Sequence, residues 1–221
     1  MSSILKQTFR CYVTSFLLVC LTVQLAATDS AHIDPTGAPG KLVIGGGGIL
    51  PPVVRQVFVG WAGGKDARLV IVPTASIQAD DAAASAAILQ DWQDEEIADA
   101  VLMHTRSRDE ANSAEFVAVL EKATGVWFVG GSQQKLADAY VGTLFEERVL
   151  ALLGRGGVVG GSSAGAAIQS RMMIQSGKTE ANIGQGFDLL PGTIIDQHFS
   201  ARNRLTRLMG AVDKNPLKVG L

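Results

Sequence analysis

The sequence predicts an α/β protein whose central sheet is mostly parallel and is covered by helices on both faces. From Lys41 onward, short apolar runs alternate with segments of ten or more residues that carry helical periodicity. The apolar runs are hydrophobic throughout rather than at every second position, which is typical of strands buried on both faces. Together these two patterns indicate a doubly wound fold.

Turn-forming residues and helix-start signals set the limits of the expected elements. Strands end at glycines, and helices begin with prolines or with acidic residues in the first turn. Strands are expected at residues 41–48, 67–76, 99–105, 125–131 and 156–161, with a further strand ending after the apolar run 193–195. Helices are expected at residues 51–64, 80–96, 109–123 and 133–155, with a helical start at 166–170.

Length and composition limit the classes of protein that the chain can belong to. Its 221 residues suffice for one domain with a sizeable core, and 47% hydrophobic with 18% charged residues is an ordinary globular composition. The formal net charge is -2 and no long basic run occurs, so no nucleic-acid-binding surface is expected.

The first 40 residues differ from the rest of the chain. Lys6 and Arg10 precede an apolar stretch at residues 11–27, which ends in small residues suited to cleavage and is too short for a convincing membrane span. We interpret it as an export signal, with an uncleaved anchor as the alternative, and expect a periplasmic or extracellular protein without a stable membrane span. The expected division is a signal at 1–27, a polar leader at 28–40 and a single α/β domain at 41–221.

Both cysteines, Cys11 and Cys20, lie inside this signal. The mature protein would have none, so neither disulfides nor thiol chemistry is expected. A lipoprotein site at Cys20 is disfavoured because Val19 stands where a small residue is needed. The three histidines show no HExxH-type spacing, and no metal is expected.

Three glycine-rich strand ends are candidates for the functional site, because sites in such sheets form at the carboxyl edges of strands. They lie at residues 45–48, 130–131 and 160–161. The first, "GGGGILPP", lacks the G-x-G-x-x-G fingerprint and places two prolines where a helix would receive a pyrophosphate. We therefore expect a tight turn near the site and no nucleotide cofactor.

The third strand end carries the motif G-x-S-x-G with Ser163 at its centre. A strand precedes it and helix-forming residues follow, which is the context of a nucleophile elbow. Ser162 fits this register less well, because only one of the two positions that flank it at a distance of two residues is glycine. A glycine- and serine-rich packing turn is the alternative interpretation.

A serine also needs a base to become a nucleophile. His198, which lies at a further strand end, is the natural candidate.

Three segments, "FVGGSQ", "GGSSAGA" and "DQHFSARNRLTRL", together resemble the cyanophycinase family, which belongs with aspartyl dipeptidases among serine peptidases. The resemblance runs from about Lys41 to the last residue. It implies a fold like that of class I glutamine amidotransferases, with serine in place of their cysteine. It also implies Ser163 as nucleophile, His198 as general base and then acid, and an oxyanion hole from the backbone N–H groups of Gly131 and Ala164.

The same resemblance implies a substrate and the residues that bind it. The family's substrate, cyanophycin, is polyaspartate with arginine attached through side-chain amides, and it is cut to β-aspartyl-arginine. Arg202 and Arg207 could bind carboxylates as a fork, and an acid such as Asp196 could bind guanidinium groups. A solvated helix face is the alternative for the arginines. The implied substrate-binding residues are Gln133, Asp196, Gln197, Arg202, Arg204 and Arg207.

Two further function classes stay open: a β-aspartyl or aspartyl dipeptidase of the same family, and a non-catalytic binding module on the same fold. The sequence also leaves open a homodimer. No cofactor is implied.

The sequence departs from the family pattern at its end. The family's third catalytic member is a glutamate in a G-I-D-E-x-T-A stretch beyond the arginine-rich helix, whereas here "NPLKVGL" ends at Leu221. Asp196, only two residues from His198, is a poor substitute for this glutamate, and Asp188 is a possible alternative orienter of the histidine. We therefore expect the domain to be truncated at its C-terminus, and this form to be weakly active or inactive and poorly soluble.

Overall fold

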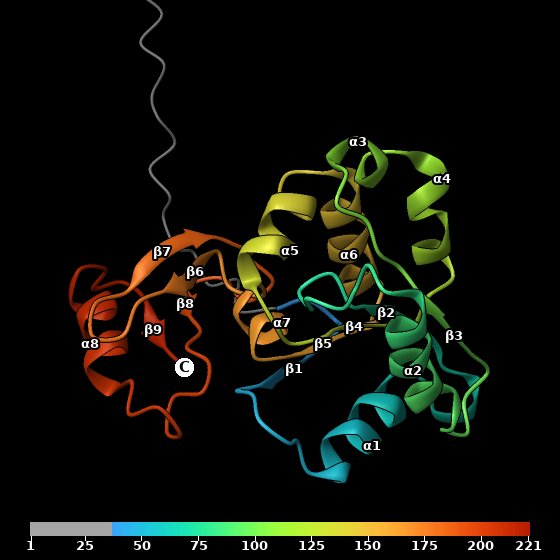
Figure 1. Ribbon diagram of the computed structural model, residues 1–221, viewed down its shortest axis with the longest axis horizontal. Helices are drawn as coiled ribbons and strands as arrows, with labels where there is room; N and C mark the ends of the chain where they lie inside the picture. The colour runs from blue at the N-terminus through green and yellow to red at the C-terminus, as the bar shows by residue number, and fades with distance from the viewer. Residues whose placement is uncertain (1–36) are drawn as a thin grey trace, which may run out of the picture. The chain divides into compact units, whose positions relative to one another are not determined.

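The structure, a computed structural model, describes residues 37–221. Its centre is a parallel five-stranded sheet in the order β1-β5-β4-β2-β3 (Figure 1). The predicted doubly wound α/β fold is confirmed. The strands are β1 (Lys41–Gly45), β2 (Arg68–Val72), β3 (Asp99–Leu102), β4 (Gly125–Phe128) and β5 (Val158–Ser162).

Helices cover both faces of this sheet, and strand residues alternate between the two cores. Leu69 and Ile71 of β2 pack in one cluster with α1 and α2. Val70 and Val72 pack in the other with α5, α6 and α7. Figure 1 shows α1 and α2 on one side of the strands and α5 and α6 on the other. The helices are α1 (Pro52–Trp61), α2 (Ala82–Gln93), α5 (Gln133–Tyr140), α6 (Leu144–Gly154) and α7 (Ala164–Ala167), with a 3-10 turn η1 (Gly64–Asp66) after α1.

Two expected helices are each interrupted. The segment 109–123 folds as α3 (Arg108–Ala111), α4 (Ala114–Val117) and the 3-10 turn η2 (Ala118–Glu121). The cause is an internal cap, since the Ser113 hydroxyl accepts from Phe116 N at 3.2 Å and starts a new helix. The segment 133–155 breaks between α5 and α6 around Gly142, whose φ of 72° suits glycine.

A smaller lobe follows the parallel sheet, and its hairpin was not anticipated from the sequence. An antiparallel pair, β6 and β7, and a short parallel pair, β8 and β9, lie beside α8 (Figure 1). Ile174, Ile194, Leu208 and Ala211 form its core. This lobe carries His198 and the arginines predicted to bind substrate, Arg202, Arg204 and Arg207. Its elements are β6 (Met172–Ser176), β7 (Asn182–Gln185), β8 (Thr193–Ile194), α8 (Leu205–Asp213) and β9 (Val219–Gly220).

Within residues 37–221, no helix is long and apolar enough to cross a membrane. The predicted export signal at 1–27 and the polar leader up to residue 36 lie outside the described residues. The domain division and the export of the protein therefore stay predictions.

Candidate active site

Ser163 occupies a sharp turn between β5 and α7. Its backbone has φ 54° and ψ −106°, a strained conformation for a residue with a side chain. The glycines two residues to either side leave the space that this turn needs. A Cβ at Gly161 would lie 2.3 Å from the carbonyl oxygen of Gly165, and a Cβ at Gly165 would lie 2.1 Å from that of Phe128. This is the geometry of a nucleophile elbow.

The elbow brings Ser163 to His198, a residue 35 positions away in the sequence. The Ser163 Oγ and His198 Nε2 atoms are 2.9 Å apart, a hydrogen-bond distance. The glycine-rich loop after β1 holds both residues. Gly45 O accepts from Ser163 N at 2.8 Å, and Gly46 O accepts from His198 N at 2.6 Å. A Cβ at Gly47 would lie 2.6 Å from the imidazole, so the ring rests on this glycine.

This role of the 45–48 loop was missed from the sequence, which indicated only a tight turn near the site. The available signal was the run of four glycines itself. At Gly47 the backbone has a φ of 114°, which side chains rarely adopt, and its Cα faces a ring. Both facts require glycine at this position.

No acid in the described residues orients the imidazole of His198. The Asp196 carboxylate is bound by Arg207, and Asp188 lies 3.7 Å from Arg171. The one hydrogen bond of the imidazole within residues 37–221 is that to Ser163. Among the same residues, no group of three or more His, Cys, Asp or Glu side chains could hold a metal ion.

Two backbone N–H groups beside Ser163 have no hydrogen-bond partner among the described residues, those of Gly131 and Ala164. Gly131 follows β4 with a φ of 144°, and a Cβ there would lie 2.1 Å from the Ala75 carbonyl oxygen. Ala164 begins α7, so its N–H belongs to the unpaired first turn of that helix. Both positions match the predicted oxyanion hole, whose function stays a prediction.

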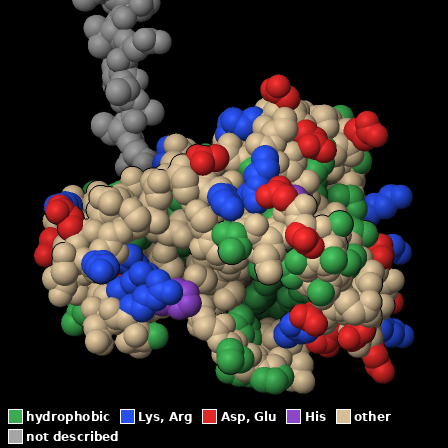
Figure 2. All heavy atoms as spheres, viewed as in Figure 1, with side chains coloured by type: hydrophobic (Ala, Val, Ile, Leu, Met, Phe, Trp, Pro, Cys, Tyr) green, Lys and Arg blue, Asp and Glu red, His purple; other side chains and the backbone are tan. Residues whose placement is uncertain are grey.

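Two cavities meet at the serine and the histidine. The polar one, of about 440 Å³, lies against the smaller lobe. Figure 2 shows basic side chains gathered beside a histidine on that side, and hydrophobic side chains lining the hollow next to it. The predicted residues that line the polar cavity are Gln133, Gln197, Arg202, Arg204 and Arg207.

Two of the three arginines that line the polar cavity, Arg204 and Arg207, lie at one carboxylate, that of Asp196. Arg207 is 1% exposed, donates through Nε and Nη2 to Asp196, and donates to Gly177 O at 2.7 Å. Arg204 donates to Gln197 O at 2.7 Å and lies 3.9 Å from Asp196. Arg202 has no ion-pair partner within the described part of the chain. The cavity therefore carries a positive excess, which suits an anionic group.

This arrangement differs from the one expected for Asp196. Its side chain is buried, is held in a fork by Arg207, and does not line either cavity. A buried carboxylate with a bidentate arginine partner positions that arginine, and its burial keeps a substrate guanidinium from reaching it. The guanidinium group of Arg207 is likewise occupied by its hydrogen bonds to Asp196.

Gln133 and Gln197, which line the polar cavity, donate hydrogen bonds to backbone carbonyl oxygens of β6. Gln133 donates through Nε2 to Ile174 O at 2.8 Å and to Gln175 O at 2.7 Å. The Oε1 atom of Gln197 is buried without a partner within residues 37–221. An unpaired buried acceptor is costly, so it marks a position where a ligand donor would be favourable.

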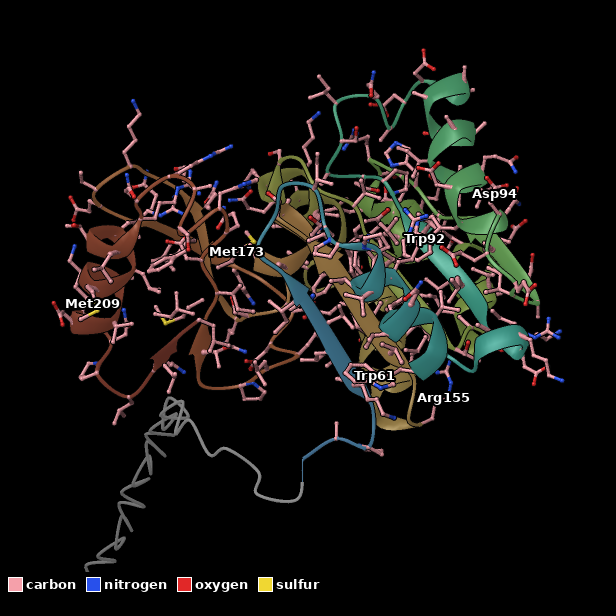
Figure 3. All side chains as sticks on the ribbon, turned by 90° about the horizontal axis from the view of Figure 1, so that it is seen from below. Trp61, Trp92, Asp94, Arg155, Met173 and Met209 are labelled. Atoms are coloured by element: carbon pink, nitrogen blue, oxygen red, sulfur yellow. The ribbon has the colours of Figure 1, made fainter. Side chains whose placement is uncertain are left out.

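The second cavity, of about 800 Å³, was not anticipated from the sequence. Apolar and aromatic side chains line most of it, among them Leu50, Ile88, Trp92 and Trp127. Trp92, labelled in Figure 3, extends from α2 into the core beside β4. At its rim, the Arg55 guanidinium carbon lies 4.7 Å from the Trp92 ring centroid. The site thus combines a cavity lined by arginines with a second cavity lined mainly by apolar side chains, and Ser163 lines both.

The charges around His198 disfavour its protonated form. Burial lowers the pKa of His198 below the ordinary value of 6.5, and the positive charges of Arg202 and Arg204 lower that pKa further. A neutral imidazole is the form that can accept a proton from the serine.

We expect this lowered pKa to appear in the pH profile of hydrolysis. Activity through a neutral base rises as His198 loses its proton, so the rising limb of kcat/KM should lie below pH 6.5. Arg202→Gln removes a repelling charge and should move the limb to higher pH. Arg68→Gln, an exposed arginine at the amino end of β2, is the matched control and should not move it. A limb that stays in place in Arg202→Gln would contradict this assignment of the base.

Comparison with known proteins relates the chain to a group of peptidases. It is 32% identical over 178 residues to a cyanophycinase from Synechococcus elongatus, which covers 76% of this chain and 54% of that protein. It is 30% identical over 181 residues to a cyanophycinase from Geminocystis herdmanii, covering 76% and 64%. The chain thus spans between 54% and 64% of the length of these curated relatives.

Solved structures agree with the fold. A crystal structure of a peptidase from an acI-B1 actinobacterium superposes with a TM-score of 0.57 at 19% identity, covering 72% of this chain and 68% of that one. The model of Peptidase family S51 matches residues 42–221, which include all three glycine-rich strand ends, Ser163 and His198. On this match the chain belongs to Peptidase family S51.

Proposed function

We propose that this chain is a serine-type hydrolase that cuts amide bonds through an acyl-enzyme on Ser163. The observation that carries the proposal is the 2.9 Å contact between Ser163 Oγ and His198 Nε2 at a strained elbow. Family membership supports it, because the match covers the whole parallel sheet and the smaller lobe.

The proposed reaction uses the contact between Ser163 and His198 first and the backbone N–H groups beside Ser163 second. His198 Nε2 accepts the hydroxyl proton while Ser163 Oγ attacks the carbonyl carbon of the substrate. The N–H groups of Gly131 and Ala164 then stabilise the oxyanion, since they have no partner among the residues that the structure describes and lie beside Ser163. His198 returns the proton to the leaving amine, and water releases the acyl group by the reverse sequence.

We further propose that the substrate carries a carboxylate next to the scissile amide, as cyanophycin and β-aspartyl peptides do. The positive excess in the polar cavity supports this class, because Arg202 has no ion-pair partner among residues 37–221 and the carboxylate of Asp196 is already bound by Arg207. The relatives named cyanophycinase favour the polymer. On this proposal the product is β-aspartyl-arginine.

A substrate panel with one arginine variant tests the proposal. We expect hydrolysis of cyanophycin to β-aspartyl-arginine, and no hydrolysis of a matched substrate in which an amide replaces the carboxylate next to the scissile bond. Arg202→Gln should raise KM about 10- to 100-fold, since a hydrogen bond to a charged group contributes about 1.5–3 kcal/mol. Arg68→Gln should leave KM unchanged. Equal turnover of the acidic and the amide peptide would contradict the substrate class.

A serine-directed fluorophosphonate separates an enzyme from a binding module. Labelling at Ser163 in the folded protein supports a hydrolase. A folded protein that binds cyanophycin but is not labelled would favour the binding module. Cleavage of the dipeptide but not of the polymer would favour a dipeptidase.

A further inference from the structure

A second polar network lies away from Ser163 and joins the loops after β2 and β3. Thr74 Oγ1 lies 2.8 Å from His104 Nδ1, and His104 Nε2 lies 2.9 Å from Asp80 Oδ1. Tyr140 OH lies 2.7 Å from the same Thr74 oxygen. Acid, imidazole and hydroxyl follow one another here as in a catalytic triad, but Thr74 is fully buried and cannot reach a substrate.

One arrangement of protons satisfies the entire chain of contacts. Burial raises the pKa of Tyr140 to about 12, so its hydroxyl keeps its proton and can donate to Thr74. Thr74 can then donate to His104 Nδ1, and His104 can donate through Nε2 to Asp80. Thr105 N donates to the tyrosine oxygen at 3.2 Å. Every donor has one acceptor, which makes the network rigid.

Arg106 fastens this network to the backbone of the loop after β2. Its guanidinium binds the Asp80 carboxylate, with Nη2 and Oδ2 3.0 Å apart. It also donates to the carbonyl oxygens of Thr74 and Ser76, on either side of Ala75. Hydrogen bonds from Arg106 and His104 lower the pKa of Asp80 to about 2, so its carboxylate stays charged at neutral pH.

The carbonyl oxygen of Ala75 connects this network to the backbone beside the active site. Its carbonyl oxygen accepts from Ser132 N at 2.8 Å. The same oxygen lies where a Cβ of Gly131 would come within 2.1 Å, so the Gly131 backbone packs directly on it. The position of the Gly131 peptide therefore depends on the position of Ala75, which Arg106 holds from both sides.

We propose that Asp80, His104, Arg106, Thr74 and Tyr140 form a strut that positions the Gly131 N–H for the developing oxyanion. This inference rests on the proposed function, in which that N–H stabilises the transition state. These are positioning residues, since none of them lines either cavity at Ser163. Their effect is on transition-state stabilisation and not on substrate binding.

The test compares two neighbouring aspartates. Asp80→Ala removes the carboxylate that joins His104 to Arg106, whereas Asp81→Ala removes the N-cap of α2 and leaves the strut intact. We expect kcat to fall at least about tenfold in Asp80→Ala with KM unchanged, since loss of an oxyanion donor costs about 10²–10³. Affinity for a peptidyl trifluoromethyl ketone, whose oxyanion needs the hole, should fall by the same factor. Asp81→Ala should retain both.

A readout without catalysis keeps the strut and the proposed function separate. Hydrogen exchange of the peptide that contains residues 129–132 should quicken in Asp80→Ala and not in Asp81→Ala. Unchanged exchange in Asp80→Ala would overturn the strut whether or not the chain is active. Unchanged kcat and inhibitor affinity in an active protein would overturn it as well. A folded wild-type chain that the fluorophosphonate does not label at Ser163, with the expected change in exchange, would instead refute the proposed function.

Discussion

Ser163→Ala is expected to reduce hydrolysis of cyanophycin by up to about 10⁶-fold, the loss seen when a serine nucleophile is removed from an intact triad. The physical reason is that, among residues 37–221, the hydroxyl of Ser163 is the one that lies within hydrogen-bond distance of the His198 imidazole. Ser163 alone sits at the strained centre of the elbow, with its oxygen 2.9 Å from His198. Binding should survive, because the polar cavity keeps its arginines.

Ser162→Ala is the matched control, since it removes the neighbouring hydroxyl from the last residue of β5. We expect this variant to retain most of the turnover. Rates are measured as released dipeptide, and circular dichroism confirms that both variants fold. Full activity in Ser163→Ala, or an equal loss in the two variants, would refute Ser163 as the nucleophile.

The parts of the site that the sequence predicted well are those set by short-range geometry. The glycines that flank Ser163 at two residues on either side require the elbow, because their Cβ atoms would meet backbone oxygens. Likewise, the apolar run of β2 is buried on both faces, and its residues alternate between the two cores. Local chemistry of this kind is readable without knowing the rest of the fold.

Long-range pairings were harder to predict. The fork between Asp196 and Arg207 depends on how α8 packs against β8, which spacing alone does not fix. Because that fork occupies the acid, the guanidinium role expected for Asp196 has no support here. The broken helix at residues 109–123 was missed for another reason, since Ser113 is compatible with a helix interior and acts as a cap in this context.

The loop after β1 gives the second large expected effect, in Gly47→Ala. A methyl group at this position would lie 2.6 Å from the His198 ring and push the imidazole away from Ser163. No acid of the described residues holds the other side of the ring, so the ring has little to resist this push. Because a displacement of about 1 Å in catalytic geometry costs about 10²-fold, we expect kcat to fall by roughly that factor.

Gly48→Ala separates the contact from backbone strain. Gly48 also has a positive φ, 83° against 114° for Gly47, so alanine is strained at both positions. A Cβ at Gly48 meets nothing within 4 Å, whereas one at Gly47 meets the imidazole. We therefore expect Gly48→Ala to lose stability without a comparable loss of kcat, measured on the folded fraction of each variant. Equal losses of kcat in the two variants would show that the loop acts through its backbone conformation, and that Gly47 does not position the base.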